Sequence, residues 1–515
     1  MSEVVEMKSS PINKPPPLEL HQITSQTPSP FHDSTPKTPK SPFASAARMM
    51  TPLASPIKKA ITSMQTYLEE VGHLTKLDPQ DKWLPITESR NGNSYYAAFH
   101  TLCSGIGFQA LLLPLAFTTL GWAWGIISLS LAFVWQLYTL WLLIQLHESV
   151  PGTRYSRYLQ LSIAAFGEKL GKILALFPTT YLAGGTCVSL IMMGGSTLKM
   201  FFQTVCGTNC DANSLSTVVW YLAFVCSAMI LAQLPNLNSI AGVSLIGAIT
   251  AVTYCTLTWT LSVSKSRPLD VSYEPVETKS DIANICSVLN ALGVIAFAFR
   301  GHNLVLEIQG TMPSTLKNPS SVPMWKGVKF AYMIIACCLF PMAIGGYWAY
   351  GNLIPANGGL LSALDRYHRN DIPKAILGLT SLFVVINCLT SFQIYAMPVF
   401  DNLEFRYTST KNRPCPWWLR TAIRVFFGCL AFFISVALPV LKSLAGLIGG
   451  IALPVTLAYP CLMWIMIKKP RTYSSMWWLN WALGCLGMIL SVLLVFGAIW
   501  IIATHGVGGH FFKPE

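Results

Sequence analysis

Long apolar stretches separated by short polar segments dominate the sequence after residue 92. A membrane-spanning helix needs about 20 mostly apolar residues. Eleven stretches are long enough: 95–120, 121–146, 170–202, 214–233, 236–263, 282–312, 327–351, 373–399, 420–440, 443–467 and 477–503. None has the two-residue alternation of a membrane β-barrel strand. The pattern therefore predicts an all-α polytopic membrane protein of about 11 transmembrane helices.

Two of these stretches are interrupted, the first within CSGIGFQALLLPLAF and the sixth within FAFRGHNLVLEIQGT. The two breaks fall at the same place in each half of the chain if stretches 1–5 and 6–10 are repeats. Because each repeat has an odd number of spans, the two halves are then inverted. Matching broken helices in inverted halves indicate a transporter site near the membrane midplane.

A helix broken inside the membrane leaves amide donors at one new end and carbonyl acceptors at the other. These groups cannot face lipid, so they must line a cavity or hold a ligand. We expect the amides of the first break to bind a carboxylate and the carbonyls of the sixth to accept from an ammonium. An α-amino acid carries both groups. The candidate substrate-binding residues at the breaks are Gly105, Ile106, Gly107, Phe108, Gln109, Phe297, Ala298, Phe299 and Arg300.

Three ionisable residues lie within eight positions of the sixth stretch. Glu307 is either half of a structural pair or a proton carrier, since a carboxyl group in an apolar interior holds its proton more tightly than in water. His302 titrates near neutral pH, or it braces the break by bonding freed carbonyls. Arg300 stays protonated and cannot carry a proton. We expect proton coupling at His302 and Glu307.

Composition and charge support a membrane protein and predict its orientation. The chain is 52% hydrophobic and 11% charged, against about 25% charged residues in soluble domains. With the first 92 residues inside, the inside loops hold 15 Lys and Arg and the outside loops hold 8. This bias places the N-terminus in the cytoplasm and the C-terminus outside. The net charge of +13 comes without a basic stripe, so we expect no nucleic-acid partner.

The first 92 residues read as a disordered, Ser/Thr-Pro-rich cytoplasmic tail. Within it, 57–75 has the pattern of a short amphipathic helix on the lipids of the inner leaflet. Ser or Thr precedes Pro eight times, which is typical of a solvated tail or of a region modified by proline-directed kinases. The candidate phosphorylation sites are Ser10, Thr27, Ser29, Thr35, Thr38, Ser41, Thr51 and Ser55.

The cysteines give little sign of metal or redox chemistry. Most of the 14 Cys are scattered singly within the apolar stretches. Cys206 and Cys210 lie in an outside loop, where a disulfide could persist. We find no metal-ligand spacing, no phosphate-binding loop and no nucleophile–base set. We therefore expect no metal, no cofactor and no enzymatic activity, with a proton gradient as the energy source.

Several longer motifs resemble the plant amino acid/auxin permease family, and within it the lysine/histidine-transporter-like branch. They are DKWLPITESRNGNSYYAAFH, LGWAWG, FAFRGHNLVLEIQGTMPSTLKNPSSVPMWKG, GGYWAYG and SFQIYAMPVFDNLE. The resemblance covers about residues 80 to 505. It implies a leucine-transporter-like fold with a 5+5 inverted repeat, discontinuous helices 1 and 6, and proton-coupled amino acid uptake at the plasma membrane. It also implies that spans 3 and 8 line the site, with Tyr181, Thr186, Asn387 and Ser391 as candidates.

The resemblance and the pattern together divide the chain into four parts. These are the tail 1–92, a first five-helix repeat 93–263, a second inverted repeat 281–467, and an eleventh helix with a short extracellular end, 468–515. The loop HESVPGTRYSRYLQL reads as a basic, amphipathic segment at the inner interface. Arg300 departs from the family, in which this position is often a small residue.

The function we predict is a secondary active transporter that imports neutral or acidic amino acids with protons by alternating access. Two alternatives stay open. One is an importer of auxin-like indole acids on the same fold. The other is a membrane sensor that binds amino acids without transporting them.

Overall fold

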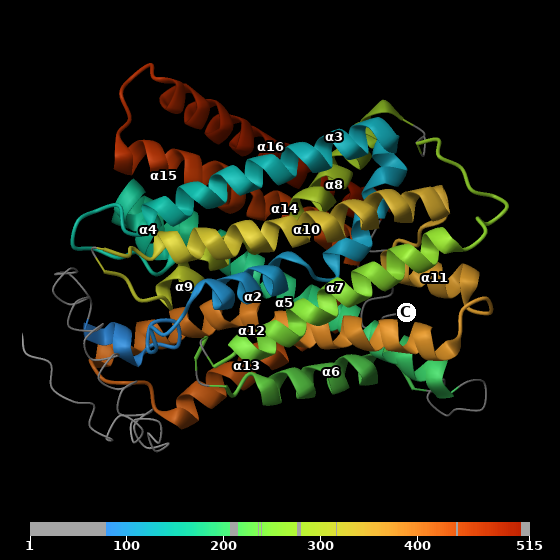
Figure 1. The fold of residues 1–515 in the computed structure, drawn as a ribbon, viewed down its shortest axis with the longest axis horizontal. Coiled ribbons are helices and arrows are strands. Elements are labelled where there is room, and N and C mark those ends of the chain that lie inside the picture. Colours follow the sequence, from blue (N-terminus) through green and yellow to red (C-terminus); the bar gives the residue numbers. More distant parts are fainter. Residues whose placement is uncertain are drawn as a thin grey trace, which may run out of the picture. The chain divides into compact units, whose positions relative to one another are not determined.

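The chain folds into helices that follow the apolar stretches of the sequence (Figure 1). The computed structural model describes residues 79–206, 215–234, 236–237, 239–275, 280–315, 317–438 and 441–505. Across these ranges there are helices and turns but no strand. Nine of the described helices are long and apolar enough to cross a membrane. The all-α membrane class is therefore confirmed.

The first two predicted spans share one unusual helix. α3 runs for 38 residues, yet Gly121 inside it has a φ of +70°, so the helix is broken there. A straight helix of that length would extend about 57 Å, well beyond a bilayer. Gly121 lies at the predicted boundary between 95–120 and 121–146. The helices of the first half are α2 (Ser94–Gly105), α3 (Gln109–Leu146), α4 (Tyr158–Phe166), α5 (Glu168–Cys206), α6 (Thr217–Leu231) and α7 (Ala241–Ser264).

The second half repeats this use of interrupted helices. α8 stops at Ala298, and the chain resumes as the 3-10 helix η4 and the short α9. A π-helical turn, η6, separates α14 from α15 in the tenth stretch. The elements are α8 (Asp281–Ala298), η4 (Gly301–Leu304), α9 (Val305–Gly310), α10 (Ser321–Tyr350), η5 (Gly351–Leu353), α11 (Gly359–His368), α12 (Lys374–Lys411), α13 (Trp417–Ala437), α14 (Leu441–Leu453), η6 (Pro454–Ala458), α15 (Tyr459–Lys468) and α16 (Ser475–His505).

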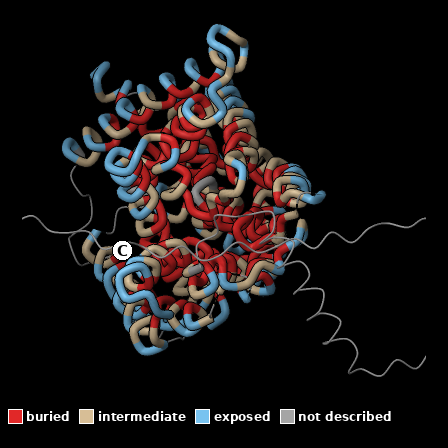
Figure 2. Tube along the Cα trace, turned by 90° about the vertical axis from the view of Figure 1, so that its left-hand side faces the viewer, coloured by how far each residue is buried: buried red, intermediate tan, exposed pale blue. Residues whose placement is uncertain are grey.

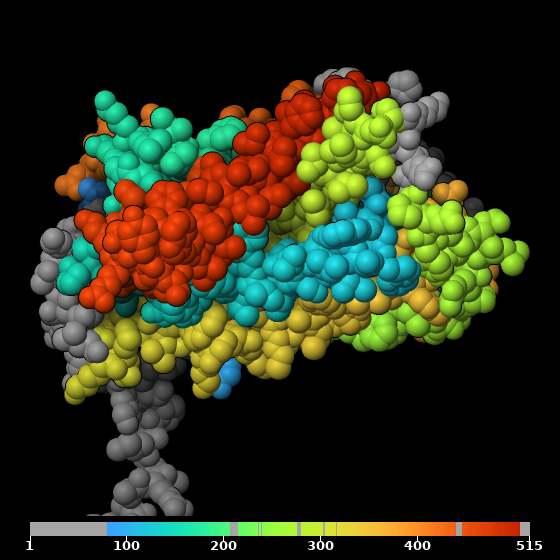
Figure 3. All heavy atoms as spheres, turned by 90° about the horizontal axis from the view of Figure 1, so that it is seen from above, coloured from blue at the N-terminus to red at the C-terminus, as the bar shows by residue number. Residues whose placement is uncertain are grey.

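The two broken helices lie in the interior of the bundle. α2 packs on α10, α7 and α12, while α8 packs on α3, α14 and α16. Figure 2 shows buried residues inside and exposed ones on the outer faces. Viewed from above, α16 covers one face beside α3 and α10 (Figure 3). The outer faces carry apolar side chains such as Leu131 and Val134 on α3 and Val492 on α16, as expected where lipid is the solvent.

The packed part of the chain begins inside the predicted tail. Pro79–Trp83 forms the 3-10 helix η2, and Leu84 and Ile86 after it are buried. Residues 1–78 lie outside the described ranges, so the eight candidate phosphorylation sites and the amphipathic segment stay predictions. Cys210 also lies outside them, and the disulfide to Cys206 likewise stays a prediction.

Candidate functional site

The first break lies in the middle of the bundle, between α2 and α3. α2 ends at Gly105, Ile106 is extended with a φ of −114° and a ψ of 108°, and α3 begins at Gln109. Ile106 and Phe108 are fully buried. Of the first amides of α3, those of Ala110 and Leu111 donate to the carbonyls of Gly107 and Phe108 at 2.9 Å and 3.0 Å, while the amides before them have no preceding turn to bond to. The break therefore leaves the amides of Gly107, Phe108 and Gln109 as the candidate donors, and their binding of a carboxylate stays a prediction.

The second break lies against the first. α8 ends at Ala298, and Phe299 leaves the helical region with a ψ of 36°. The rings of Phe297 and Phe108 pack with their centroids 5.8 Å apart. A Cβ built on Gly301 would lie 3.2 Å from Ser104 Oγ, so backbone approaches backbone closely here. The two breaks thus form one site, which the sequence could place only by analogy between the halves.

One face of α12 holds the first break in place. Asn387 Nδ2 donates to the carbonyl of Ile106 at 3.3 Å, and Ser391 Oγ donates to that of Cys103 at 3.0 Å. One further turn along, Tyr395 Oη donates to the carbonyl of Ser104 at 2.8 Å. These three residues recur every four positions, so they share a helix face. They satisfy carbonyls that the end of α2 would otherwise leave bare.

Gln136 of α3 holds the second break in a similar way. Its Nε2 donates to the carbonyl of Phe299 at 2.7 Å. Of the three carbonyls predicted to receive an ammonium, the one at Phe299 therefore already has a protein donor. The carbonyls of Phe297 and Ala298 end the helix α8 beside it.

Arg300 lies between the two breaks and is 1% exposed. Its guanidinium carbon is 5.1 Å from the ring centroid of Phe108, 4.7 Å from that of Phe297 and 4.9 Å from that of Tyr395. Within the described part of the chain, none of its three side-chain nitrogens has a hydrogen-bond partner. Cation–π contacts with three rings stabilise the charge, and among the described residues no carboxylate forms an ion pair with it.

Glu307 follows the second break by a few residues. It lies in the first turn of α9, is 5% exposed, and accepts the amide of Tyr158 on Oε1 at 3.3 Å. Its other oxygen, Oε2, has no partner among the described residues. A carboxylate in a first turn favours the helix start. Glu307 is therefore a buried acid that is hydrogen-bonded on one side only.

Comparison with known proteins identifies the family. The family model for the transmembrane amino acid transporter protein matches residues 90–504. The chain belongs to this family of transmembrane amino acid transporters. It is 60% identical over 467 residues to "Lysine histidine transporter-like 8" of Arabidopsis thaliana, with 91% of this chain and 90% of the relative covered. "Lysine histidine transporter-like 7" of the same plant is 47% identical, with 85% and 90% covered. The predicted branch is thus confirmed, and a transporter rather than an enzyme is what the family implies.

Solved structures confirm the fold. A Na⁺-coupled sialic acid symporter in a substrate-bound, outward-open state matches with a TM-score of 0.52 at 12% identity, covering 87% of this chain and 97% of its own. Mhp1, a nucleobase-cation-symport-1 family transporter, matches with a TM-score of 0.52 at 11% identity, covering 84% and 97%. At such low sequence identity these similarities indicate only a shared fold. The leucine-transporter-like architecture with discontinuous helices 1 and 6 is therefore confirmed.

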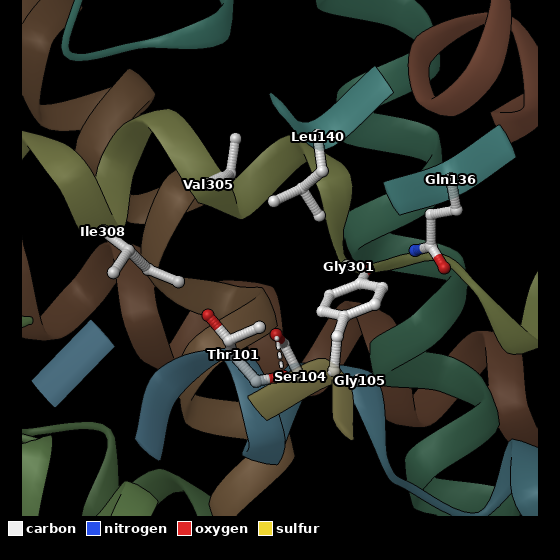
Figure 4. Close-up of a pocket in the computed structure, with 9 residues that line it drawn as sticks. Thr101, Ser104, Gly105, Gln136, Leu140, Gly301, Val305 and Ile308 are labelled. Carbon is white, nitrogen blue, oxygen red and sulfur yellow. Dashed lines mark hydrogen bonds between the residues drawn. The ribbon is translucent and has the colours of Figure 1, made fainter. Parts of the chain in front are cut away.

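A small cavity lined by both polar and apolar side chains opens beside the breaks (Figure 4). Its volume of about 10 Å³ is close to that needed for a single water molecule. The hydroxyl of Thr101 has no partner among the described residues, and that of Ser104 donates to the carbonyl of Thr101 at 3.2 Å. The lining residues are Thr101, Ser104, Gly105, Gln136, Leu140, Gly301, Val305, Ile308 and Tyr332.

Residues 79–93, which we call the N-terminal segment, bind to other parts of the transporter at one end of the bundle. Arg157 donates to Asp81 Oδ1 at 2.9 Å and to Asp401 Oδ2 at 2.5 Å. The amide of Ile86 donates to Asp401 Oδ1 at 3.2 Å. Asp401 is fully buried and Arg157 is 3% exposed. One guanidinium thus joins the N-terminal segment, the α3–α4 loop and α12.

The two Arg residues of the α3–α4 loop, Arg154 and Arg157, are buried in the protein. Arg154 lies 3.2 Å from Glu148 and donates to the carbonyl of Gln309, so it is buried rather than lipid-facing. Burial lowers the pKa of His147 to about 4, so near neutral pH Arg154 supplies the positive charge beside Glu148. The interfacial position of the loop stays a prediction, but both of its Arg residues bind buried acceptors, which the local sequence does not reveal.

The candidate residues on the third span are less well connected to the breaks. Thr186 is fully buried on α5, and its hydroxyl has no partner among the described residues. Tyr181 is half-buried, with its ring 5.9 Å from that of the exposed Phe177. The side chain of His302 lies outside what the structure describes, so its part in coupling stays a prediction.

Sequence reasoning missed Gln136 and Tyr395, which both bind carbonyls at the breaks. The four-residue spacing of Asn387, Ser391 and Tyr395 was a usable signal for Tyr395. Gln136 offered a weaker one, as a lone amide in an otherwise apolar stretch. Polar side chains inside a membrane helix are costly and usually functional or paired.

Proposed function

We propose that this chain is a secondary active transporter that imports amino acids together with protons across the plasma membrane. The observation that carries the proposal is the pairing of the two helix breaks. The amide end of α3 and the carbonyl end of α8 meet, with the rings of Phe108 and Phe297 5.8 Å apart. A carboxylate suits the first end and an ammonium suits the second.

Glu307 is our candidate for the proton carrier. It is buried, bonded on one oxygen only, and follows the second break directly in α9. A group that binds and releases a proton near the substrate couples proton transport to substrate transport if its proton affinity and the substrate affinity both change during alternating access. His302, on η4, is the second candidate on the same stretch.

The direction of transport follows from the predicted orientation. The excess of Lys and Arg in alternate loops supports a cytoplasmic N-terminus and an extracellular C-terminus. Import then requires the site to open first toward the C-terminal side. The N-terminal segment, bound through Arg157 to Asp401, would close the cytoplasmic end at that stage.

The test is uptake of labelled amino acids by transport-deficient cells that express the full chain. Uptake should be saturable, should increase as the external pH is lowered, and should be lost when a protonophore collapses the gradient. Replacing sodium by choline should leave it unchanged. Sodium-dependent uptake would contradict proton coupling. Binding of amino acids without accumulation of any of the twenty would favour the sensor instead.

Glu307→Gln isolates the coupling step. The glutamine keeps the acceptor for the Tyr158 amide but cannot exchange a proton, so uptake should lose its pH dependence while substrate binding persists. Glu168→Gln is the matched control, because Glu168 is an exposed acid at the start of α5. Unchanged pH dependence in Glu307→Gln would remove Glu307 as the carrier.

A further inference from the structure

Arg300 is a buried cation that has no ion-pair partner among the residues that the structure describes. Its Nε, Nη1 and Nη2 atoms have no hydrogen-bond partner among the described residues, although the side chain is 1% exposed. The aromatic rings around it attract the charge but cannot accept its five N–H bonds. Burying a charge is costly unless an opposite charge and hydrogen bonds compensate it. An anion bound to the guanidinium would therefore lower the cost of burying it.

The acids on the surrounding helices are engaged elsewhere. On α12, Asp401 pairs with Arg157, and Glu404 lies 3.0 Å from Arg420. On α9, Glu307 receives the amide of Tyr158. The acids at the starts of α5 and α8 are exposed at the helix ends. No ion pair of Arg300 occurs within the described residues, so none of these acids serves as its counter-ion.

The geometry also shows where an anion would bind. A Cβ built on Gly107 would lie 2.6 Å from Gln109 Oε1 and 3.3 Å from Arg300 Nη2, so the guanidinium reaches the start of α3. The amides at the start of α3 carry partial positive charge of their own. Amides and guanidinium therefore converge on one place, and a planar guanidinium binds a carboxylate with two parallel hydrogen bonds.

We propose that Arg300 binds a carboxylate of the transported substrate and makes this site selective for amino acids of net charge −1, those with an acidic side chain. The inference rests on the proposed amino acid transport. A zwitterionic substrate adds no net charge and leaves the site at +1, whereas an acidic amino acid makes it neutral. A basic amino acid adds a second positive charge next to Arg300 and is disfavoured.

Binding to the purified full chain tests the proposal, with L-glutamate, L-glutamine and L-lysine as probes. Glutamine matches glutamate in shape and differs in charge. We expect glutamate to bind at least about ten-fold more tightly than glutamine, which is the range of one charged hydrogen bond, and lysine not to bind. The measurement is the ligand-dependent rise in unfolding temperature, confirmed by competition for labelled glutamate.

Variants of Arg300 test whether this residue causes the preference for glutamate. Arg300→Gln should lower the affinity for glutamate about ten-fold or more and leave that for glutamine nearly unchanged. Arg300→Lys keeps the charge without the planar fork, so it should retain part of the preference. The matched control is Arg366→Gln, because Arg366 is exposed on α11 and should leave both affinities unaltered.

Three results would overturn the proposal. They are equal affinities for glutamate and glutamine in the natural protein, a glutamate preference that persists in Arg300→Gln, and binding of indole-3-acetate in place of glutamate. If Arg300→Gln does not fold, the affinities of the three ligands for the natural protein and for Arg300→Lys still test the proposal. Glutamate binding that depends on Arg300 without uptake would support this inference and contradict transport. Proton-coupled uptake with no preference for charge would support transport and contradict this inference.

Discussion

Removing the carboxylate of Asp401 should loosen the N-terminal segment. Arg157 Nε lies 2.5 Å from Asp401 Oδ2, and its Nη1 lies 2.9 Å from Asp81 Oδ1. Asp401 also accepts the amide of Ile86 at 3.2 Å. Asp401→Ala therefore breaks a buried ion pair and a backbone hydrogen bond in one step.

The expected loss of stability follows from burial. The side chain of Asp401 is 0% exposed and that of Arg157 is 3% exposed. Removing one partner of such a pair typically costs about 3–5 kcal/mol, because the other charge stays buried. Arg157 keeps Asp81 as a partner, so we expect a decrease of about 2–4 kcal/mol in the free energy of unfolding.

Two measurements check this prediction on protein purified in detergent. The unfolding temperature of Asp401→Ala should fall, and the amides of residues 84–93 should exchange hydrogen faster. Glu168→Gln is the control, because the Glu168–Lys172 pair is exposed and contributes little. Its unfolding temperature and hydrogen exchange should match those of the natural protein.

A double-mutant cycle separates the ion pair from other effects. Asp401→Ala combined with Arg157→Ala leaves no orphaned guanidinium. The double variant should therefore be more stable than the sum of the single effects predicts, by at least about 1 kcal/mol. Strict additivity, or an Asp401→Ala protein as stable as the natural one, would refute the reasoning.

Three further substitutions test the packing at the site. Gly107→Ala should weaken substrate binding, since the new Cβ would lie 2.6 Å from Gln109 Oε1 and 3.3 Å from the buried guanidinium; Gly184→Ala, with nothing within 4 Å, should bind normally in the same assay. Gly449→Ala should lower the unfolding temperature, because its Cβ would lie 2.0 Å from the carbonyl of Gly293 and force α8 and α14 apart. A temperature equal to or above that of the natural protein would contradict this close approach. Tyr395→Phe should cost about 1–3 kcal/mol by leaving a buried carbonyl bare; unchanged thermal unfolding would show that its hydrogen bond is dispensable.

The helices and their breaks could be predicted because both depend on local chemistry. Apolar length determines where a chain can cross lipid, and Gly105, Gly107 and the polar run after Phe299 mark where the helix cannot continue. The break at Gly121 likewise falls at a predicted span boundary. For the same reason the sequence identified the first and sixth spans as the place to look for a substrate.

Tertiary structure alone decided which side chains meet at the site and at the N-terminal segment. Arg157 and Asp401 are 244 positions apart, and Gln136 and Phe299 are 163 apart. Such pairs depend on how the helices pack against one another, and the hydrophobic pattern does not specify that packing. The sequence by itself determined the transporter architecture and that a charge interrupts the sixth span. Only the packing showed that Arg154 and Arg157 of the α3–α4 loop are buried and that Arg300 lies among three rings with no ion pair among the described residues, because the partners of a charge are set by contacts between distant segments.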